Sequence, residues 1–221
     1  MKEEAGPFRR MAGSRPDISI LIVGIGRKNA ERALRDYLKS CRSRGNETQI
    51  KKQSESPDVV SYRLVLTCGF AGGLNPDLKL GDVVFEPGTQ TPESGTQLIA
   101  AGAKPAKFFC ADRIATTVGE KKKLRAETGA DAVEMESAAI HEVCAEQGIP
   151  CITVRVISDT AHEDLPLDFN QLSKPDQSLD FGKLFLAIAK SPGKIPALMQ
   201  LGKKTKFAAE RMAEVLGKVI G

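Results

Sequence analysis

The chain has 221 residues, of which 41% are hydrophobic and 27% are charged, with a net charge of +4. This composition is typical of a globular protein and excludes disordered, collagen-like and coiled-coil chains. No segment approaches the roughly 18 consecutive apolar residues of a membrane span, and the N-terminus lacks the apolar centre of a secretory signal. Tryptophan is absent and tyrosine is rare, which disfavours a nucleic-acid surface built on stacked bases. We expect a cytoplasmic chain with free thiols, folded as one domain over residues 1–221, with no membrane or nucleic-acid partner.

The first half of the sequence alternates between predicted strands and helices. A β-branched apolar run predicts a strand at residues 18–23, and helical periodicity predicts a helix at residues 29–39. Residues 42–55 are polar and predict a loop. Two more strands are predicted at residues 64–67 and 83–85. Residues 88–96, rich in proline, glycine and threonine, are expected to be mobile.

The second half continues the alternation. Strands are predicted at residues 108–110 and 151–157, and helices at 119–128 and 137–147. Two C-terminal helices follow, separated by Ser191-Pro192-Gly193. The second of them places apolar residues near one face, namely Leu198, Leu201, Ala208, Met212, Val215 and Val219. Strands that alternate with helices predict an α/β fold with a largely parallel sheet.

Gly24-Ile25-Gly26 follows the first predicted strand, as in dinucleotide-binding turns. The third glycine of that motif is replaced by Asn29, and no acidic residue ends a second strand at the required distance. We therefore expect no nucleotide cofactor. The turn still offers backbone N–H groups to an anion, with Arg27 beside it. Neither the histidines nor the cysteines have metal-ligand spacing, so no metal is expected.

Three segments at the ends of predicted strands contain residues suited to ligand binding or catalysis. They are the glycine-rich run Cys68-Gly-Phe-Ala-Gly-Gly-Leu74, the acidic Glu134-Met-Glu136 and Ser158-Asp159. Each has a plainer explanation: a tight turn, acids that complement a helix dipole, and a cap, respectively. All three are expected at carboxyl ends of strands, where ligands collect in open α/β sheets. Arg155 also needs a charged partner if it is buried in its apolar strand.

These segments resemble a known family. Cys68-Gly-Phe-Ala-Gly-Gly-Leu-Asn-Pro-Asp-Leu-Lys-Leu-Gly-Asp-Val-Val84, Ala132-Val-Glu-Met-Glu-Ser-Ala-Ala139 and Arg155-Val-Ile-Ser-Asp159 are similar to the nucleoside phosphorylase/nucleosidase superfamily. The similarity covers about residues 18–165 and is greatest to 5′-methylthioadenosine/S-adenosylhomocysteine nucleosidases and related hydrolases, including the hopanoid-pathway nucleosidase. It implies a three-layer α/β/α sandwich around a mixed, barrel-like sheet, in a homodimer or alternatively a hexamer. It also implies that the chain begins about where the first strand should end, so that strand is expected to be lacking.

The resemblance further implies cleavage of the N-ribosidic bond of a purine nucleoside, with a 5′-substituted adenosine as the expected substrate. Asp159 matches the carboxylate that protonates the leaving base, a role in which burial would help to keep it protonated. Glu136 matches the acceptor for the ribose hydroxyls. The other expected substrate-binding residues are Met135, Glu134, Ser158, Phe70, Ala71, Gly72 and Ile114.

The nucleophile distinguishes hydrolysis from phosphorolysis. Thr67 and Phe70 stand where phosphorolytic relatives carry arginine and serine, so the resemblance favours water. Glu4 aligns best with the glutamate that activates this water. Two alternatives stay open: a phosphorylase whose anion site uses Gly24, Gly26 and Arg27, with Arg9 or Arg10, and a catalytically inactive nucleoside-binding relative. The segment 88–107 is expected to border the 5′ end of the substrate.

Overall fold

The computed structural model of the protein describes residues 2–12, 15–49, 64–87, 92–172, 174 and 180–220. Its helices are α1 (Lys2–Ala12), α2 (Arg27–Gln49), α3 (Pro92–Ala100), α4 (Val118–Thr128), α5 (Ser137–Glu146), α6 (Phe181–Lys190), the 3-10 turn η1 (Pro192–Lys194) and α7 (Ile195–Ile220). Its strands are β1 (Val65–Gly73), β2 (Val83–Phe85), β3 (Lys104–Pro105), β4 (Phe108–Cys110), β5 (Ala132–Glu134) and β6 (Cys151–Asp159).

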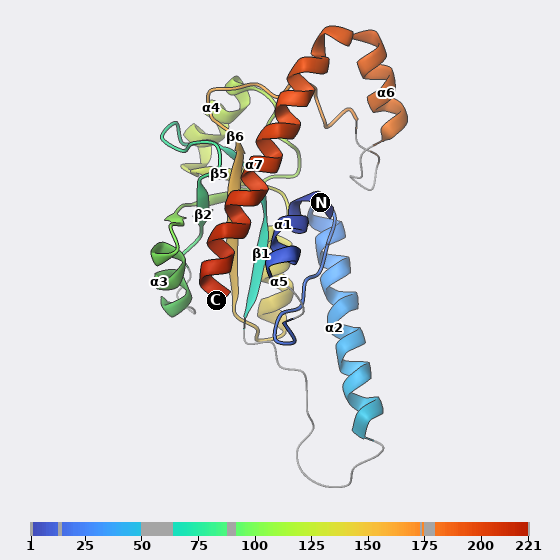
Figure 1. Ribbon diagram of the computed structural model, residues 1–221, viewed down its shortest axis with the longest axis vertical. Coiled ribbons are helices and arrows are strands. Elements are labelled where there is room, and N and C mark those ends of the chain that lie inside the picture. Colours follow the sequence, from blue (N-terminus) through green and yellow to red (C-terminus); the bar gives the residue numbers. More distant parts are fainter. Residues whose placement is uncertain are drawn as a thin grey trace.

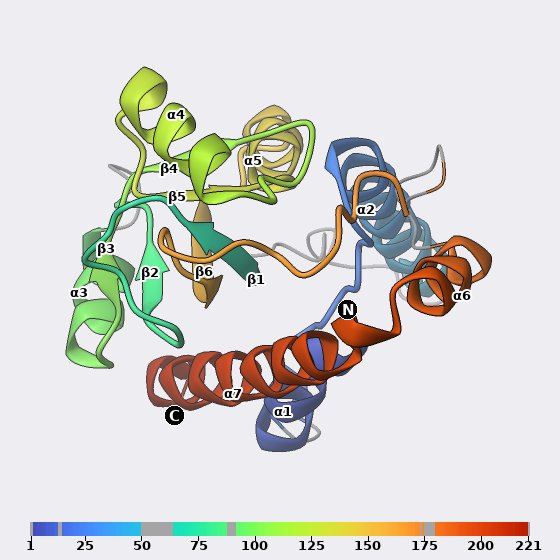
Figure 2. The same cartoon turned by 90° about the horizontal axis from the view of Figure 1, so that it is seen from above.

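A sheet lies between two layers of helices (Figures 1 and 2). The strand order is β3-β2-β6-β1-β5-β4. Helices α1 and α7 cover one face, and α4 and α5 lie on the other. Helix α2 packs beside α5 through a cluster that includes Ala30, Leu34, Ile140 and Val143. The expected α/β fold, with helices on both faces of a curled sheet, is confirmed.

The sheet is mixed, as the resemblance implied, whereas the alternation of elements had predicted a largely parallel sheet. The long strands β1 and β6 run parallel, from Val65 beside Cys151 to Ala71 beside Ile157. Strand β2 runs antiparallel to β6, and β5 runs antiparallel to β1. Parallel neighbours need a long crossover, usually a helix. The short connection at residues 74–82 has none, so β2 reverses the direction of the chain.

Strand β6 is buried along almost its whole length and positions both the core and the site. Ile152, Val154 and Val156 pack with Met212 and Leu216 of α7. Because side chains alternate across a strand, Thr153 and Arg155 face the other side of the sheet. The C-terminal helices are confirmed, and of the predicted α7 face Ala208, Met212 and Val215 are buried.

Three predictions about the first half of the chain are wrong. Residues 18–23 form no strand; they have no ladder partner in the described chain, and Leu21 and Val23 pack instead against the α2–α5 cluster. Helix α2 continues through residues 42–49, which were predicted as a loop. Strand β1 extends through the glycine-rich run to Gly73, so that run is not a tight turn.

The segment predicted to be mobile is in part a helix. Residues 92–96 form the first half of α3, where Leu98 is fully buried against the core. Residues 50–55 and 88–91 of the predicted loop and mobile segment lie outside the described part of the chain.

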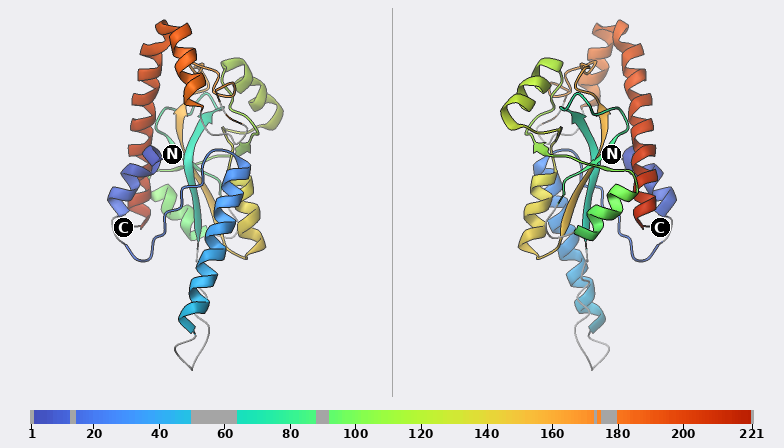
Figure 3. Two further views of the ribbon diagram at one scale, coloured as in Figure 1. Left: turned by 90° about the vertical axis from the view of Figure 1, so that its right-hand side faces the viewer. Right: turned by 90° about the vertical axis from the view of Figure 1, so that its left-hand side faces the viewer.

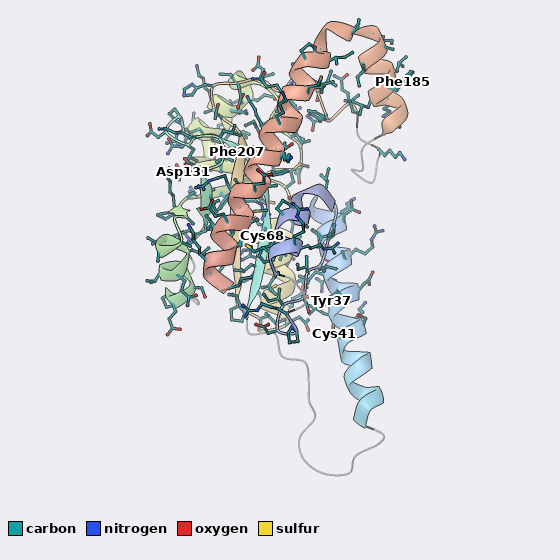
Figure 4. All side chains as sticks on the ribbon, viewed as in Figure 1. Tyr37, Cys41, Cys68, Asp131, Phe185 and Phe207 are labelled. Carbon is teal, nitrogen blue, oxygen red and sulfur yellow. The ribbon has the colours of Figure 1, made fainter. Side chains whose placement is uncertain are left out.

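Two helical parts extend beyond the sheet. The lower half of α2 projects past the sheet at one end, and the hairpin of α6 and α7 projects at the other (Figure 3). Phe185 lies on α6, away from the sheet, and is 74% exposed (Figure 4). None of the described helices combines the length and the apolar character needed to cross a membrane.

Candidate active site

A cavity of about 610 Å³ lies beside β1 and is bordered by residues of both helical layers. Residues 17–25, the start of α1 and one side of α7 form its apolar walls. Its polar residues come mainly from β1, β6 and the end of β5 with the turn that follows it; they include Thr67, Glu134, Glu136, Arg155, Ser158 and Asp159. The three segments singled out in the sequence therefore meet in one cavity.

The reason they meet differs from the expected one. Carboxyl ends gather at one edge only in a parallel sheet, and β5 runs antiparallel to β1. Strand β5 is short, however, and pairs only with the last two residues of β1, Gly72 and Gly73. Its end therefore still reaches the cavity.

Arg155 has the buried charged partner that its place in the sequence required. Its guanidinium donates to Glu134 Oε2 at 2.6 Å and to the carbonyl oxygen of Thr67 at 2.7 Å. The side chains of Arg155 and Glu134 are 1% and 0% exposed. Arg155 Nε has no hydrogen-bond partner among the described residues.

Glu134 is held from several sides. Its carboxylate accepts the backbone N–H groups of Glu136 and Ser137 and the Ser137 hydroxyl. Burial alone would raise its pKa, but the charge of Arg155 and these hydrogen bonds together hold the pKa of Glu134 below its ordinary value. Glu134 is therefore a carboxylate fixed by the protein.

Glu136 is freer and faces the cavity. Its Oε1 accepts the backbone N–H of Gly26 at 2.7 Å, and its Oε2 lies 3.9 Å from the Arg155 guanidinium. Its side chain is 20% exposed. Burial raises the pKa of Glu136, against the opposing effects of Arg155 and the Gly26 amide. Its remaining lone pairs are available to hydroxyl groups of a ligand.

Asp159 ends β6 at the same cavity and is buried, as expected. Its Oδ1 accepts the Ser158 hydroxyl at 2.8 Å. Its Oδ2 lies 2.6 Å from Nζ of Lys121, a fully buried side chain of α4. Lys121, which was not predicted as a site residue, therefore forms a buried ion pair with Asp159.

The glycines of β1 allow close packing around these groups. A Cβ atom at Gly72 would lie 3.2 Å from Asp159 Oδ2 and 3.2 Å from a methyl group of Val133. Gly69 lies over the Arg155 guanidinium with more room, since the nearest atom to its Cβ would be 3.8 Å away. Phe70, Ala71 and Gly72 all line the cavity, as expected for substrate-binding residues.

Met135 and Ile114 also line the cavity. The backbone of Ile114 is fixed by Asn170, which accepts its N–H at 2.9 Å and donates to its carbonyl oxygen at 3.0 Å. Ile114 therefore sits on a loop that is anchored from the segment after β6.

The groups expected to bind an anion are engaged within the protein. Gly24 lines the cavity, and Gly24 and Gly26 have positive φ angles of 88° and 84°, which favour glycine. The Gly26 N–H is donated to Glu136. The Arg27 guanidinium pairs with Glu142 at 2.9 Å on the surface. The anion-binding role of Gly24, Gly26 and Arg27 stays a prediction.

Glu4 lies within α1, which packs beside α7, and its side chain is outside the described part of the structure. Its neighbour Ala5 lines the cavity. The role of Glu4 as a water-activating base therefore stays a prediction. Within the described ranges, no group of three or more histidine, cysteine, aspartate or glutamate side chains could hold a metal ion.

Lys121 is the site residue that the sequence analysis missed. Residues 119–128 were predicted only as a helix, and lysine is seldom fully buried. The signal was its spacing: Lys121 is three residues before Leu124 and seven before Thr128, so all three share one helix face.

Comparison with known proteins finds similarity to one superfamily. A family model described as "Phosphorylase superfamily" matches residues 103–190. The chain is 26% identical to a 5′-methylthioadenosine/S-adenosylhomocysteine nucleosidase of Shewanella halifaxensis, over 56% of this chain and 66% of the relative. It is 30% identical to an aminodeoxyfutalosine nucleosidase of Campylobacter jejuni, over 48% of this chain and 60% of the relative. The chain is thus similar to the phosphorylase superfamily over this region.

Solved structures agree on the fold. A futalosine hydrolase of Helicobacter pylori superposes with a TM-score of 0.61 at 18% identity, over 100% of this chain and 94% of that one. A 5′-methylthioadenosine/S-adenosylhomocysteine nucleosidase of Neisseria meningitidis, solved with methylthio-immucillin-A, gives a TM-score of 0.63 at 17% identity, over 100% and 95%.

The superfamily match covers only part of the candidate site. It includes Glu134, Met135, Glu136, Ser158 and Asp159, while the glycine-rich strand β1 precedes it. The matched stretches also span slightly less than two thirds of the relatives named above.

Proposed function

We propose that this chain hydrolyses the N-ribosidic bond of a purine nucleoside, with a 5′-substituted adenosine as substrate. The observation that carries the proposal is the shared cavity of Glu136 and Asp159, two carboxyl groups that come from different strands and differ in their partners. The match to the phosphorylase superfamily and the names of the relatives support the same reaction class.

The reaction needs a proton for the departing base and stabilisation of a cationic ribose. In this proposal Asp159, supported by Ser158, protonates the base. Glu136 accepts hydrogen bonds from the ribose hydroxyls, and its negative charge stabilises the positive charge that develops on the sugar. Met135 packs on the ribose, and Ile114 packs beside the base.

Two observations favour water over phosphate. The Gly26 amide and the Arg27 guanidinium, which an anion would need, already bind Glu136 and Glu142. Phe70 places an aromatic ring on the cavity wall. Glu4 is our candidate to activate the water. We further propose, on the family resemblance, that the chain works in the cytoplasm as a homodimer.

A substrate panel tests the proposal. We expect base release from adenosine derivatives without phosphate, with a free sugar rather than a sugar 1-phosphate as the product. Asp159→Asn should lower kcat by about 10²–10⁴-fold, since this is the usual contribution of general acid catalysis. Asp112→Asn, at an exposed aspartate of the same chain, is the matched control. Release that requires phosphate would support the phosphorylase instead, and ligand binding without turnover would support an inactive relative.

A further inference from the structure

The environment of Lys121 is unusual for a lysine. Its side chain is 0% exposed, and Nζ contacts three oxygen atoms: Asp159 Oδ2 at 2.6 Å, the Thr160 carbonyl at 2.7 Å and the Glu163 carbonyl at 2.9 Å. An ammonium group has three N–H donors and no acceptor. Two hydrogen bonds go to the carbonyl oxygens, and the contact with Asp159 is an ion pair.

The ammonium and the Ser158 hydroxyl together fix Asp159. The Ser158 hydroxyl donates to Oδ1, and Lys121 forms an ion pair with Oδ2, so each oxygen of the carboxyl group is held by a different element. One further lone pair on each oxygen remains for a ligand in the cavity. The orientation of Asp159 towards the cavity therefore depends on α4 as well as on β6.

Other charged groups surround this pair. The Glu163 carboxylate, in the loop after β6, accepts the Thr160 N–H at 2.8 Å and pairs with Lys204 of α7. Lys121 and Lys204 both act on Glu163, whose pKa is lowered by Lys204 and the Thr160 amide against the effect of burial. Arg155 lies with Glu134 across the same cavity. The positive charge that contacts the carboxyl group of Asp159 directly is that of Lys121.

We propose that Lys121 is a positioning residue for the reaction, which orients the carboxyl group of Asp159 towards the leaving base. The inference rests on the proposed function. Lys121 is itself fixed by the carbonyl oxygens of Thr160 and Glu163, so its ion pair with Oδ2 holds Asp159 in one orientation.

The test measures kcat and KM separately in two variants. Lys121→Met removes the charge and the donors, and Lys121→Gln removes the charge but keeps an N–H donor. We expect kcat to fall by about tenfold or more in Lys121→Met because the orientation of Asp159 is lost, while KM stays close to the wild type because Glu136 still binds the ribose. Lys121→Gln should recover part of the lost kcat. Lys122→Met, at the exposed neighbour on α4, should keep the wild-type kcat and KM.

A second comparison shows whether Lys121 acts through Asp159. When Lys121→Met is added to Asp159→Asn, the residual kcat should stay as in the single Asp159→Asn variant. A loss of kcat that is as large in the Asp159→Asn background as in the wild-type background would overturn the inference, since a purely structural role does not act through Asp159. A wild-type kcat in Lys121→Met would overturn it as well. A wild-type chain that cleaves no nucleoside would instead overturn the proposed function.

Discussion

Glu134 and Glu136 are two residues apart and both lie near Arg155, yet the protein shifts their pKa values in opposite directions. The pKa of Glu134 is lowered, since Arg155 and Ser137 outweigh its burial. The pKa of Glu136 is raised by its burial, since Arg155 is more distant from it and the Gly26 amide compensates only in part. Carboxyl groups whose pKa values are separated in this way commonly have different roles. We assign Glu134 to structure and Glu136 to the ligand.

Substrate binding should depend on the ionisation of Glu136. Because its pKa is raised, the carboxylate is lost at a less acidic pH than for an ordinary glutamate, and KM should rise as the pH falls through that range. Glu136→Gln should raise KM by about tenfold and remove this acid limb. The measurement is KM against pH, with a substrate lacking the 2′-hydroxyl as the comparison. An unaltered KM in Glu136→Gln for the full substrate would contradict the ribose-binding role.

The buried ion pair predicts acid sensitivity of the fold. Glu134 has a pKa below that of the unfolded chain, so its contribution to stability is present above the ordinary glutamate value of about 4.3 and is lost as the pH falls further. Glu134→Gln should lower the free energy of unfolding at neutral pH by about 3–5 kcal/mol, because it leaves Arg155 buried without its main partner. It should also flatten the loss of stability in acid.

Denaturant unfolding between pH 3 and pH 7 measures both effects. Glu142→Gln, which removes the surface partner of Arg27, is the control and should leave the unfolding curve nearly unchanged. Equal curves for Glu134→Gln and the control would show that the pair does not support the fold.

Among the elements, β1 shapes the cavity because its glycines carry no side chain. A methyl group at Gly72 would press on Asp159 and Val133, whereas one at Gly69 would make only ordinary contacts with Arg155. Gly72→Ala should therefore lower kcat by at least about tenfold through displacement of Asp159, and Gly69→Ala should leave kcat close to the wild type. Steady-state kinetics on the two variants tests this difference. Equal losses of kcat would mean that β1 tolerates no added side chain at either position, rather than that Gly72 alone must lie close to Asp159.

The two helices of one layer meet at a glycine of α7. A Cβ atom at Gly217 would collide with Met11 of α1, whereas Gly202 of the same helix has open space around it. We expect Gly217→Val to lower the free energy of unfolding by about 1–3 kcal/mol. Gly202→Ala should raise it by about 0.5–1 kcal/mol, since alanine favours the helix. Thermal unfolding compares the two, and a stable Gly217→Val chain would mean that α1 does not dock as described.

For the whole molecule, local patterns predicted the parts that depend on nearby residues. The apolar run at residues 151–157 predicted strand β6. Arg155 within this run required a charged partner, and Glu134 is that partner. The direction of β2 and β5 could not be predicted, since pairing depends on residues far apart in the sequence. The apolar run at residues 18–23 looks like a strand locally, but a strand also needs a neighbour with free N–H and C=O groups. Lys121 was missed for the same reason, because only the folded chain brings it to Asp159.

The hydrogen bond from Gly26 to Glu136 joins parts of the chain that are 110 residues apart. Gly26 follows the irregular segment that lines the cavity, so the carboxylate is oriented only while that segment is docked. When residues 18–26 open locally, Glu136 therefore loses its hydrogen bond to Gly26 and with it the orientation needed to bind the ribose. The rate at which the Gly26 amide hydrogen exchanges with solvent consequently measures the fraction of molecules whose site is assembled, and a bound nucleoside should slow that exchange.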